Sequence, residues 1–331
     1  MIRYKCIVSY CGAAYSGWQR QKDVKSIQET IEQAIRIITC EDTCIVGSGR
    51  TDAGVNALGQ VFHFDSSVDM SCYKWKGALN RFLPNDIHIL SMEKVDERFH
   101  ARFGVKSKRY DYCVNLGECD VFTRDTVYQY CRKLDIEKMK EASKYFIGTH
   151  DFTSFCSNSK ELMEDQVRTI YDIQFKLEGE VLRISYYGNG FMRYMVRMMS
   201  GELIEVGRGK FEPNQIKNHL DAKSKTVVRK NAPSEGLTLV HVDYYDVLAI
   251  NDEYYVRDLC EEKEDHLIYV IAERKTDDVV GKIYYDNEKS KIKIVLCHFV
   301  DKEINVLIND VKEQLKHKYS GVKEIVVGEY E

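Results

Sequence analysis

The chain has 331 residues, enough for two or three domains with a sizeable hydrophobic core. Hydrophobic residues make up 44% of it and charged residues 30%, a balance typical of soluble proteins, and no stretch of about eighteen apolar residues predicts a membrane span. The net charge of −4 is unevenly divided, because residues 1–245 contain 35 Lys and Arg against 32 Asp and Glu, whereas residues 246–331 contain 13 against 20. The body of the chain can therefore present a basic face to phosphates.

Eleven cysteines are scattered along the chain without a Cys-x-x-Cys pair. Cys40 and Cys44 stand four residues apart, but no second pair of Cys or His lies nearby in the sequence to complete a zinc site. The pattern predicts reduced thiols and no metal site. The N-terminal segment MIRYKCIVSYCG lacks signal-peptide architecture, so we expect a cytoplasmic protein that does not contact a membrane.

The N-terminal part of the chain predicts a sheet covered by two helices. Residues 2–10 alternate in polarity, as expected of a strand. Ser26 and Glu29 form a capping-box pattern, and the isoleucines at helical spacing behind it predict an amphipathic helix over residues 27–39. The further elements expected here are strands at 43–48, 60–64 and 87–94 and a helix at 72–82. This order of elements is typical of an α+β sandwich.

A loop between the first strand and the first helix carries Tyr15, Trp18, Gln19 and Arg20. Aromatic, amide and guanidinium groups on one glycine-containing loop can stack on bases and hold phosphates. Trp18 and Arg20 are therefore candidate substrate-binding residues. For Trp18 the alternative is a ring that only caps the core.

Residues 47–65 read GSGRTDAGVNALGQVFHFD, and four glycines give this stretch unusual backbone freedom. Arg50, Thr51 and Asp52 place a cation, a hydroxyl and a carboxylate side by side, directly before a run of strand formers. An aspartate before Ala-Gly is, taken alone, usually a turn or helix N-cap residue. A polar loop on a rigid support is also where chemistry usually lies, and the whole string favours that interpretation of Asp52.

Residues 99–114 read FHARFGVKSKRYDYCV and carry four cations within eight residues. The cations are Arg102, Lys106, Lys108 and Arg109. Such a cluster is either a solvated charge run or a phosphate-binding segment. The strand expected after it places Tyr110 and Tyr112 on the same face, because side chains alternate along a strand.

The second half of the body predicts further helices and strands. We expect a helix at 135–147, two strands within 166–188, a loop and a buried helix within 189–209, and a strand within 231–244. The methionines of the buried helix are interpreted as packing residues. Arg197 lies among them, where an unpaired charge is costly, so it is expected either to pair with a carboxylate or to reach the surface along an amphipathic face.

Several of these stretches resemble the tRNA pseudouridine synthase A (TruA) family. The string GRTDAGVNALGQVFHF resembles the family's signature around its catalytic aspartate, and HARF followed by KRYDY resembles its second motif. YSGWQRQ, DFTSF and EGLTLV add to a resemblance that covers about residues 1–245. It implies an α+β pseudouridine synthase fold, a mixed and mainly antiparallel sheet with flanking helices and a central cleft, in two halves at 1–105 and 106–245.

The resemblance also implies roles for individual residues. Asp52 matches the catalytic aspartate, Tyr110 the active-site tyrosine, and Arg197 an arginine that pairs with the aspartate and keeps it ionised. Leu237 matches a residue that lines the uracil pocket. The other substrate-binding candidates are Arg50, Thr51, Trp18, Arg20, Arg102, Lys108 and Arg109. Arg50 either fills the space of a flipped nucleotide or forms a salt bridge with Asp52.

The reaction implied by the resemblance is the isomerisation of uridine to pseudouridine in the anticodon stem-loop of tRNA, at positions 38–40. It implies a homodimer and neither cofactor nor metal. Asp52 either attacks C1′ or removes a ribose proton by a glycal route. Two residues depart from the family pattern. Lys108 stands where an arginine is common, and Asn56 replaces a histidine, which removes any cationic contact that the histidine makes with RNA.

Residues 246–331 lie outside the resemblance. We expect strands at 267–274, 281–286, 291–299 and 323–328 and a helix at 303–318. The order β-β-β-α-β is similar to part of a GNAT-type acetyltransferase, but the segment CHFVDKEIN lacks the glycines of a pyrophosphate-binding loop. We therefore expect a small acidic α/β appendix with a structural or partner-binding role.

Three other functions stay open at this point. A catalytically silent or retargeted RNA-binding paralogue is consistent with Asn56 but not with intact Asp52, Tyr110 and Arg197. An acyltransferase that acts from the tail would need the phosphate loop that the sequence lacks. A plain glycosidase would normally need a second working carboxylate, which the loop around Asp52 does not offer.

Overall fold

The computed structural model describes residues 1–157, 166–245, 247–250, 254–258, 267–273, 279–286, 291–296, 302–319, 322 and 324–329. Backbone contacts divide the chain into two compact units. The first unit contains Met1–Val95 and Val105–Asp243, and the second contains Asp96–Gly104 and Tyr244–Glu331. The chain thus passes from the first unit to the second at Asp96 and returns to the first unit at Val105.

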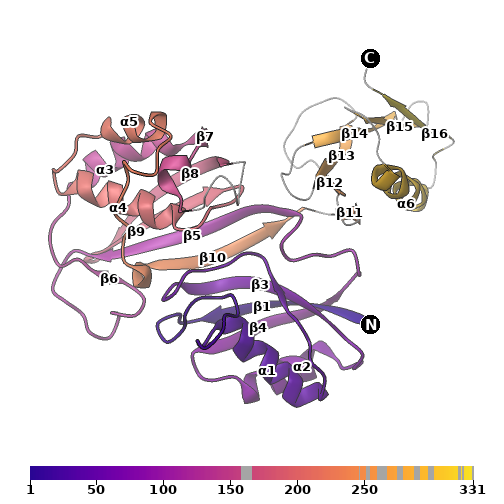
Figure 1. The fold of residues 1–331 in the computed structure, drawn as a ribbon, viewed down its shortest axis with the longest axis horizontal. Coiled ribbons are helices and arrows are strands. Elements are labelled where there is room, and N and C mark those ends of the chain that lie inside the picture. Colours follow the sequence, from indigo (N-terminus) through magenta and orange to yellow (C-terminus); the bar gives the residue numbers. More distant parts are fainter. Residues whose placement is uncertain are drawn as a thin grey trace. The chain divides into compact units, whose positions relative to one another are not determined.

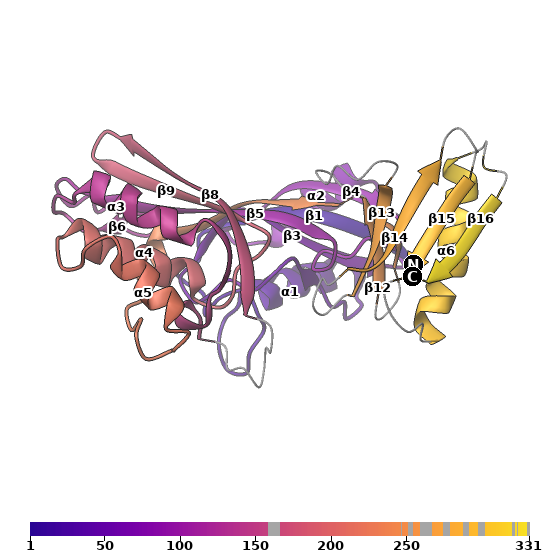
Figure 2. The same ribbon diagram turned by 90° about the horizontal axis from the view of Figure 1, so that it is seen from above.

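A ten-stranded sheet forms the centre of the first unit (Figures 1 and 2). Its strands are β1 (Ile2–Tyr10), β2 (Val46–Gly47), β3 (Asn56–Ser66), β4 (Ile87–Val95), β5 (Val105–Asn115), β6 (Tyr128–Gln129), β7 (Gly148–Asp151), β8 (Val167–Glu178), β9 (Val181–Gly188) and β10 (Leu237–Tyr244). The order is β4-β1-β3-β10-β5-β9-β8-β7, with β2 beside β3 and β6 beside β5. The pairs β3–β10 and β5–β6 are parallel, whereas β1–β3, β1–β4, β5–β9 and β8–β9 are antiparallel. The expected mixed, mainly antiparallel sheet is confirmed.

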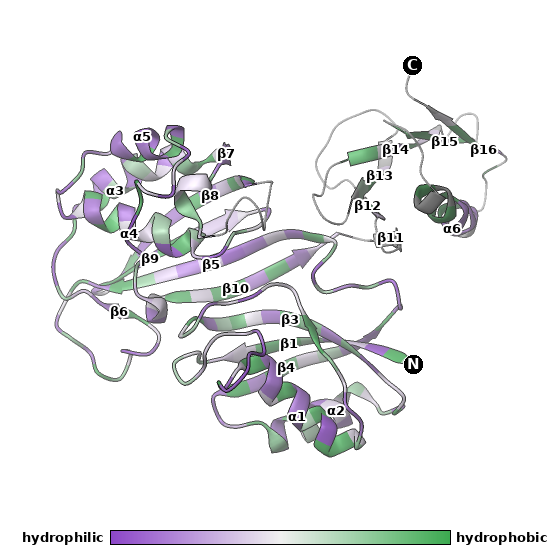
Figure 3. Ribbon diagram, viewed as in Figure 1, coloured by the Kyte–Doolittle hydropathy of each residue, from purple (hydrophilic) through white to green (hydrophobic). Residues whose placement is uncertain are grey.

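Two helices, α1 (Ile27–Thr39) and α2 (Cys72–Phe82), lie against the part of the sheet formed by β1, β3 and β4 (Figure 1). Ser26 begins α1 as predicted, because its hydroxyl accepts a hydrogen bond from the backbone N–H of Glu29 at 3.3 Å. Ile27, Ile31 and Ile35 are fully buried, so α1 is amphipathic, with its polar and apolar residues visible in Figure 3. Each fully buried isoleucine stabilises this packing by about 1.5–3 kcal/mol.

Three helices lie together over β5, β8 and β9: α3 (Ile136–Ser143), α4 (Met195–Gly207) and α5 (Gln215–Asp221) (Figure 1). The helix expected at 135–147 is confirmed, although its last turn is a 3₁₀ helix at Lys144–Phe146. Further 3₁₀ turns lie at Thr153–Phe155 and Ser234–Gly236. Met195 and Met199 are fully buried on α4, which confirms their role in packing.

The second unit contains a six-stranded sheet and one helix. Its elements are β11 (Val247–Ile250), β12 (Tyr254–Asp258), β13 (Leu267–Glu273), β14 (Val279–Asp286), β15 (Lys291–Leu296), α6 (Lys302–Lys318) and β16 (Glu324–Glu329). The strands are ordered β11 to β16, and α6 connects the parallel pair β15–β16. The predicted β-β-β-α-β order is confirmed for the last five elements, but two strands before them were missed. The segment 297–301, where a phosphate-binding loop was sought, lies outside the described residues.

The segment Asp96–Gly104 is attached to the beginning of the C-terminal residues. The Tyr244 hydroxyl donates to the Ala101 carbonyl at 2.6 Å, and the backbone N–H of Tyr245 donates to the Gly104 carbonyl at 2.9 Å. The rings of Phe99 and Tyr244 lie 5.2 Å apart. These contacts explain why a loop between two core strands belongs to the second unit.

Candidate active site

The loop of residues 48–55 is held between three other parts of the first unit. The Gln60 amide donates to the Gly49 carbonyl at 2.9 Å, which ties the loop to β3. The backbone N–H of Trp18 donates to the Thr51 carbonyl at 3.0 Å, which ties it to the loop after β1. Gly54 has a φ of 75°, and a Cβ there would meet the Ser234 hydroxyl at 2.5 Å, so glycine is required where the loop approaches β10. The loop is therefore rigidly supported, as its sequence predicts.

Asp52 in this loop faces two guanidinium groups. Its Oδ2 atom lies 3.6 Å from Nη1 of Arg197, and its Oδ1 atom lies 4.0 Å from Nε of Arg193. The Asp52 side chain is 19% exposed, so it is largely buried but still reachable. Burial raises the pKa of Asp52, and the charges of Arg197 and Arg193 oppose this rise without cancelling it. The predicted pair with Arg197 is present, but its effect on the pKa is smaller than that of burial.

Arg197 reaches Asp52 from the first turn of α4. Its Nε atom donates to the Ala232 carbonyl at 2.8 Å, and the Ala232 N–H donates to the Arg197 carbonyl at 3.0 Å. The side chain is only 15% exposed. Arg197 therefore does not extend to the surface along an amphipathic face, and the alternative considered for it is wrong.

Tyr110 projects from β5 toward the same place. It is buried, its ring meets the edge of Phe191 at a centroid distance of 5.2 Å, and its phenol interacts electrostatically with Asp52 and Tyr10. Burial raises the pKa of Tyr110 well above its usual value, and the negative charge of Asp52 raises it further. The Tyr110 phenol therefore holds its proton more tightly than an ordinary tyrosine does.

Leu237 lies at the start of β10, and its side chain is buried. The parallel register pairs Thr238 with Asn56, which brings Leu237 to the end of the Asp52 loop. The structure thus brings together Asp52, Arg197 and Tyr110, which come from three separate stretches of the sequence.

Trp18 and Thr51 are turned into the protein. Trp18 is 2% exposed, and its ring packs against Tyr10 and Phe62 at centroid distances of 6.0 and 6.2 Å. A side chain this buried cannot stack on a base, so Trp18 caps the core, which is the alternative considered for it. The Thr51 hydroxyl is also buried and is hydrogen-bonded to the Tyr10 hydroxyl at 2.9 Å. These two side chains position the loop.

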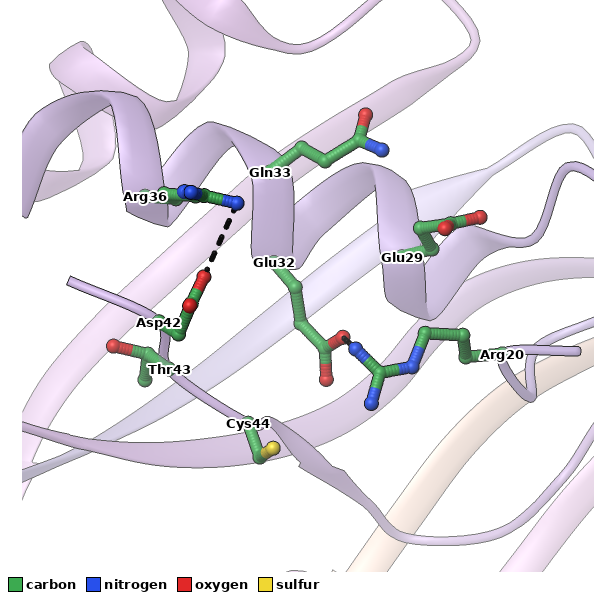
Figure 4. Close-up of a pocket in the computed structure, with 8 residues that line it drawn as sticks. All are labelled: Arg20, Glu29, Glu32, Gln33, Arg36, Asp42, Thr43 and Cys44. Carbon is green, nitrogen blue, oxygen red and sulfur yellow. Dashed lines mark hydrogen bonds and ion pairs between the residues drawn. The ribbon is translucent and has the colours of Figure 1, made fainter. Parts of the chain in front are cut away.

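Arg50 and Arg20 lie nearer the surface. Nε of Arg50 donates to the Gln19 side chain at 3.0 Å, and within the described residues Asp52 is paired with other arginines. The salt bridge considered between Arg50 and Asp52 is therefore wrong. Arg20 pairs with the buried Glu32 at 3.1 Å and lines a hollow of about 390 Å³ beside α1, which Figure 4 shows together with Arg36 and Asp42. The residues that line this hollow do not include Asp52, Tyr110 or Arg197.

The cations of residues 102–109 have separate surroundings. Nζ of Lys108 donates to the Ser48 carbonyl at 2.9 Å, so Lys108 supports the Asp52 loop from β5. Arg109 forms a bidentate pair with the buried Asp111, at 2.9 and 3.0 Å, on the face of β5 opposite Tyr110. Arg102 is exposed and belongs to the second unit. Lys108 and Arg109 are therefore both engaged by other groups of the protein, and their roles in substrate binding stay predictions.

Asn56 is a buried hydrogen-bonding centre. Its side-chain oxygen accepts from the Gly12 N–H at 2.8 Å, and its amide donates to the carbonyls of Asp125 and Glu235 at 2.9 and 3.1 Å. With 3% of its surface exposed, it cannot contact RNA. This position joins three loops inside the protein, and the consequence of replacing the histidine stays a prediction.

Sequence reasoning missed three residues of the site. Arg193 and Tyr194 lie immediately before α4, and the Tyr194 ring has the guanidinium carbons of Arg193 and Arg197 at 4.9 and 5.2 Å from its centroid. Helical spacing does not predict this pair of arginines, because Arg193 lies outside α4 and Tyr194, with a φ of 65°, interrupts the helical backbone between them. Tyr10 is the last residue of β1, and its hydroxyl is hydrogen-bonded to that of Thr51. The two residues are 41 positions apart, so the sequence alone does not indicate this contact.

Two features are absent from the described part of the chain. No group of three or more His, Cys, Asp or Glu side chains is placed to hold a metal ion. No helix is long and apolar enough to cross a membrane.

Comparison with known proteins identifies the family of this chain. The sequence model described as tRNA pseudouridine synthase matches residues 6–104 and 142–245, more than half of the chain. The chain belongs to the tRNA pseudouridine synthase family. This family consists of isomerases, and the chain is an enzyme of that class. The match includes the Asp52 loop and the first turn of α4. Tyr110 on β5 lies between the two matched ranges.

Curated members of the tRNA pseudouridine synthase family are similar over nearly their whole length. The tRNA pseudouridine synthase A of Bacillus pumilus is 46% identical over 246 residues, which are 73% of this chain and 99% of that protein. Those of Anoxybacillus flavithermus and Brevibacillus brevis are 44% and 43% identical, over 74% of this chain and 99% and 100% of their own lengths. About a quarter of this chain is therefore additional to these relatives.

Proposed function

We propose that this protein isomerises uridine to pseudouridine in the anticodon stem-loop of tRNA, at positions 38–40, with Asp52 as the nucleophile or catalytic carboxylate at C1′. The observation that carries the proposal is the meeting of Asp52, Arg197 and the buried ring of Tyr110 at one place in the first unit. The relatives named tRNA pseudouridine synthase A support tRNA as the substrate. The anticodon position rests on the motif resemblance alone.

The chemistry needs one carboxylate near C1′. Pseudouridine forms when the N1–C1′ bond breaks, the uracil turns and C5 bonds to C1′, with loss of only the C5 proton. A carboxylate can stabilise the oxocarbenium-like transition state or bond to the sugar, as in retaining glycosidases. The uracil leaves as a stabilised anion, so no second carboxylate has to protonate it. Among the described residues the charged groups that face Asp52 are guanidinia, which agrees with this requirement.

Tyr110 is 8% exposed, more than Trp18 at 2%, and we propose that it contacts the target base with its ring. Its phenol keeps its proton at neutral pH, because burial and Asp52 both raise its pKa. A role for it as acceptor of the C5 proton would need the bound uracil to change these surroundings. Cleavage without formation of pseudouridine in Tyr110→Phe would support that role, and unchanged turnover would remove it.

The test is release of tritium from C5-labelled uridine in tRNA transcripts. We expect release by the wild type and a loss of at least about 10³-fold in Asp52→Ala and Asp52→Asn. Asp42→Asn is a matched control, since its side chain is 85% exposed and pairs only with the surface residue Arg36 among the described residues. Transcripts with cytidine at positions 38, 39 and 40 should release no tritium. Equal release by the wild type and Asp52→Ala would contradict the assignment of Asp52.

Membership in a family of isomerases argues against the silent RNA-binding paralogue that the sequence left open. Such a paralogue would bind tRNA without releasing tritium, so the same assay combined with filter binding distinguishes it from an active enzyme. The acyltransferase and glycosidase alternatives gain no support from the described residues. The homodimer, the cytoplasmic location, the absence of a cofactor, the division of the core at 105/106 and the partner-binding role of the appendix stay predictions.

A further inference from the structure

Cys119 and Cys131 lie close together on the segment that passes from β5 to the residues after β6. Both are free thiols, and Cys119 is exposed whereas Cys131 is half-buried. Their side chains interact directly. Partial burial raises the pKa of Cys131, and the charge of Cys119 and a hydrogen bond between the two thiols raise that pKa further. Two sulfur atoms in contact are close to the geometry from which a disulfide forms.

The buried Asn115 at the end of β5 fixes the main chain beside both cysteines. Its carbonyl accepts from the Cys131 N–H at 2.9 Å. Its side-chain amide donates to the carbonyl of Glu118, directly before Cys119, at 2.5 Å and to the Gln129 side chain of β6 at 2.8 Å. The meeting of the two thiols is therefore imposed by the backbone, through hydrogen bonds that start from one buried side chain.

Gln129 fixes the other side of Cys119. Its Oε1 atom accepts from the Asp120 N–H at 2.9 Å, so hydrogen bonds hold the residues on both sides of this cysteine. Cys131 has a φ of 57°, a left-handed conformation that favours glycine or asparagine. The backbone conformation therefore does not explain why a cysteine stands at this position.

The two thiols can react in sequence with a low-molecular-weight disulfide. The exposed Cys119 reacts first, because its thiolate attacks one sulfur of the small disulfide, forms a mixed disulfide and releases one small thiol. The Cys131 thiol then gives its proton to water and attacks the Cys119 sulfur, which forms the bond between the two cysteines and releases the second small thiol. Two electrons pass from the pair of cysteines to the small disulfide, and a dithiol reverses the reaction.

We propose that Cys119 and Cys131 are a site of reversible disulfide formation by low-molecular-weight disulfides, with Cys119 as the attacking thiol and Cys131 as the resolving thiol. The reduced thiols expected from the sequence are the resting state of this pair. The bond closes a loop that contains Asp125, whose carbonyl accepts from the Asn56 amide at 2.9 Å, directly after the Asp52 loop. The inference does not depend on the proposed reaction with RNA.

Peptide mapping of the folded, full-length protein tests the proposal. The wild type, Cys119→Ser, Cys131→Ser and Cys44→Ser are treated with oxidised glutathione, quenched with acid, alkylated and digested with trypsin. Cleavage after Arg124 separates peptide 110–124 from peptide 125–132, so that only a disulfide keeps them together. We expect the linked peptides in the wild type and in the matched control Cys44→Ser, which removes an exposed thiol between α1 and β2. The linked peptides should be absent from the other two variants, and dithiothreitol should separate them in the wild type.

The mixed disulfide with glutathione distinguishes a reacting pair from two thiols that are only neighbours. In Cys131→Ser it should accumulate at Cys119 at least about tenfold above its level in the wild type, because no resolving thiol removes it. Equal accumulation in the two proteins, or no linked peptides in the wild type, would overturn the proposal. Linked peptides that persist in Cys119→Ser would overturn it as well, because they would assign the bond to Cys113. Circular dichroism before oxidation checks the fold of each variant, and Cys119→Ala replaces Cys119→Ser if the serine variant does not fold.

Discussion

Nη1 of Arg197 lies 3.6 Å from Oδ2 of Asp52, while Nε of the same guanidinium donates to the Ala232 carbonyl at 2.8 Å. The arginine is therefore fixed by the main chain and not by the carboxylate that it faces. A separation of 3.6 Å is longer than a hydrogen bond, so Arg197 supplies charge without occupying the oxygen atom. This arrangement suits a carboxylate that has to react with a substrate.

The first prediction concerns the pH dependence of the reaction in Arg197→Gln. Burial raises the pKa of Asp52 and Arg197 lowers it, so loss of the cation should raise it further. The active form is the carboxylate, hence the acid limb of kcat/KM should move to higher pH, and activity below that limb should fall. Arg197→Lys keeps a cation and should show a smaller displacement. If the acid limb of Arg197→Gln lay at the same pH as that of the wild type, the charge of Arg197 would have no effect on the pKa of Asp52.

A second prediction concerns the ionisation of Tyr110. An ordinary tyrosine titrates near about pH 10, whereas burial and the charge of Asp52 raise the pKa of Tyr110. An ultraviolet difference titration of the wild type against Tyr110→Phe should therefore show no tyrosinate signal from this residue around pH 10. In Asp52→Asn the signal should appear at lower pH than in the wild type, since one of the causes of the rise is removed. A normal titration of Tyr110 in the wild type would contradict its buried position.

The sequence predicted the elements of the first unit well where local signals were strong. The capping box at Ser26 and the isoleucine spacing behind it fixed the bounds of α1, and alternation fixed β1. The short helix α5 was missed because seven residues give too little periodicity. In the second unit β12 was missed because YYVRD is short and charged.

The candidate site was predictable where a motif named the residue and not where only the fold supplies the contact. Asp52 and Arg197 were paired in advance through the resemblance to a family. The burial of Trp18, the support from Lys108 to Ser48 and the pair between Arg109 and Asp111 depend on packing and register between distant segments. A charged or aromatic residue in a motif can serve either the ligand or the loop, and residue type alone does not distinguish these roles.

A third prediction concerns Asn56, which replaces the histidine of the family motif. Asn56→Ala leaves the Gly12 N–H and the Asp125 and Glu235 carbonyls without this partner, so we expect a loss of about 2–4 kcal/mol in the free energy of unfolding. A neutral histidine offers one acceptor and one donor, so Asn56→His should lose only about 1 kcal/mol. Urea denaturation of the two variants measures the difference, and equal losses would contradict it.

The same position should make the stability of Asn56→His depend on pH. The Gly12 N–H needs an acceptor, which a protonated imidazole cannot provide, so the folded state should depress the pKa of the new histidine. Its contribution to stability is then present above the unfolded pKa of about 6.5 and is lost as the pH falls below it. The wild type, with Asn56, should show no such loss over this range beyond that of its other groups.

The last prediction concerns the buried Glu205 of α4, which connects indirectly to the site. Its carboxylate lies 2.6 Å from Lys230, 3.0 Å from Lys210 and 3.2 Å from Arg208, and Lys230 leads within two residues to the Ala232 carbonyl that holds Arg197. Burial alone would raise the pKa of Glu205, but the hydrogen bonds from Lys230 and Lys210 outweigh it and lower the pKa. Glu205 therefore stabilises the fold above its unfolded pKa, and this contribution is lost as the pH falls through the lower folded value.

Glu205→Gln should accordingly unfold at a lower temperature than the wild type at pH 7, by about 2–4 °C for each kcal/mol lost. The difference should shrink as the pH is lowered, because the wild-type carboxylate is then protonated as well. Glu212→Gln is the matched control, since this exposed glutamate meets only Lys138 among the described residues, at 3.3 Å. A Tm difference for Glu205→Gln that stays constant down to acid pH would show that packing, and not charge, holds this part of α4. Loss of turnover at pH 7 out of proportion to the loss of stability would locate the effect of Glu205 at the Lys230–Ala232 segment behind Arg197.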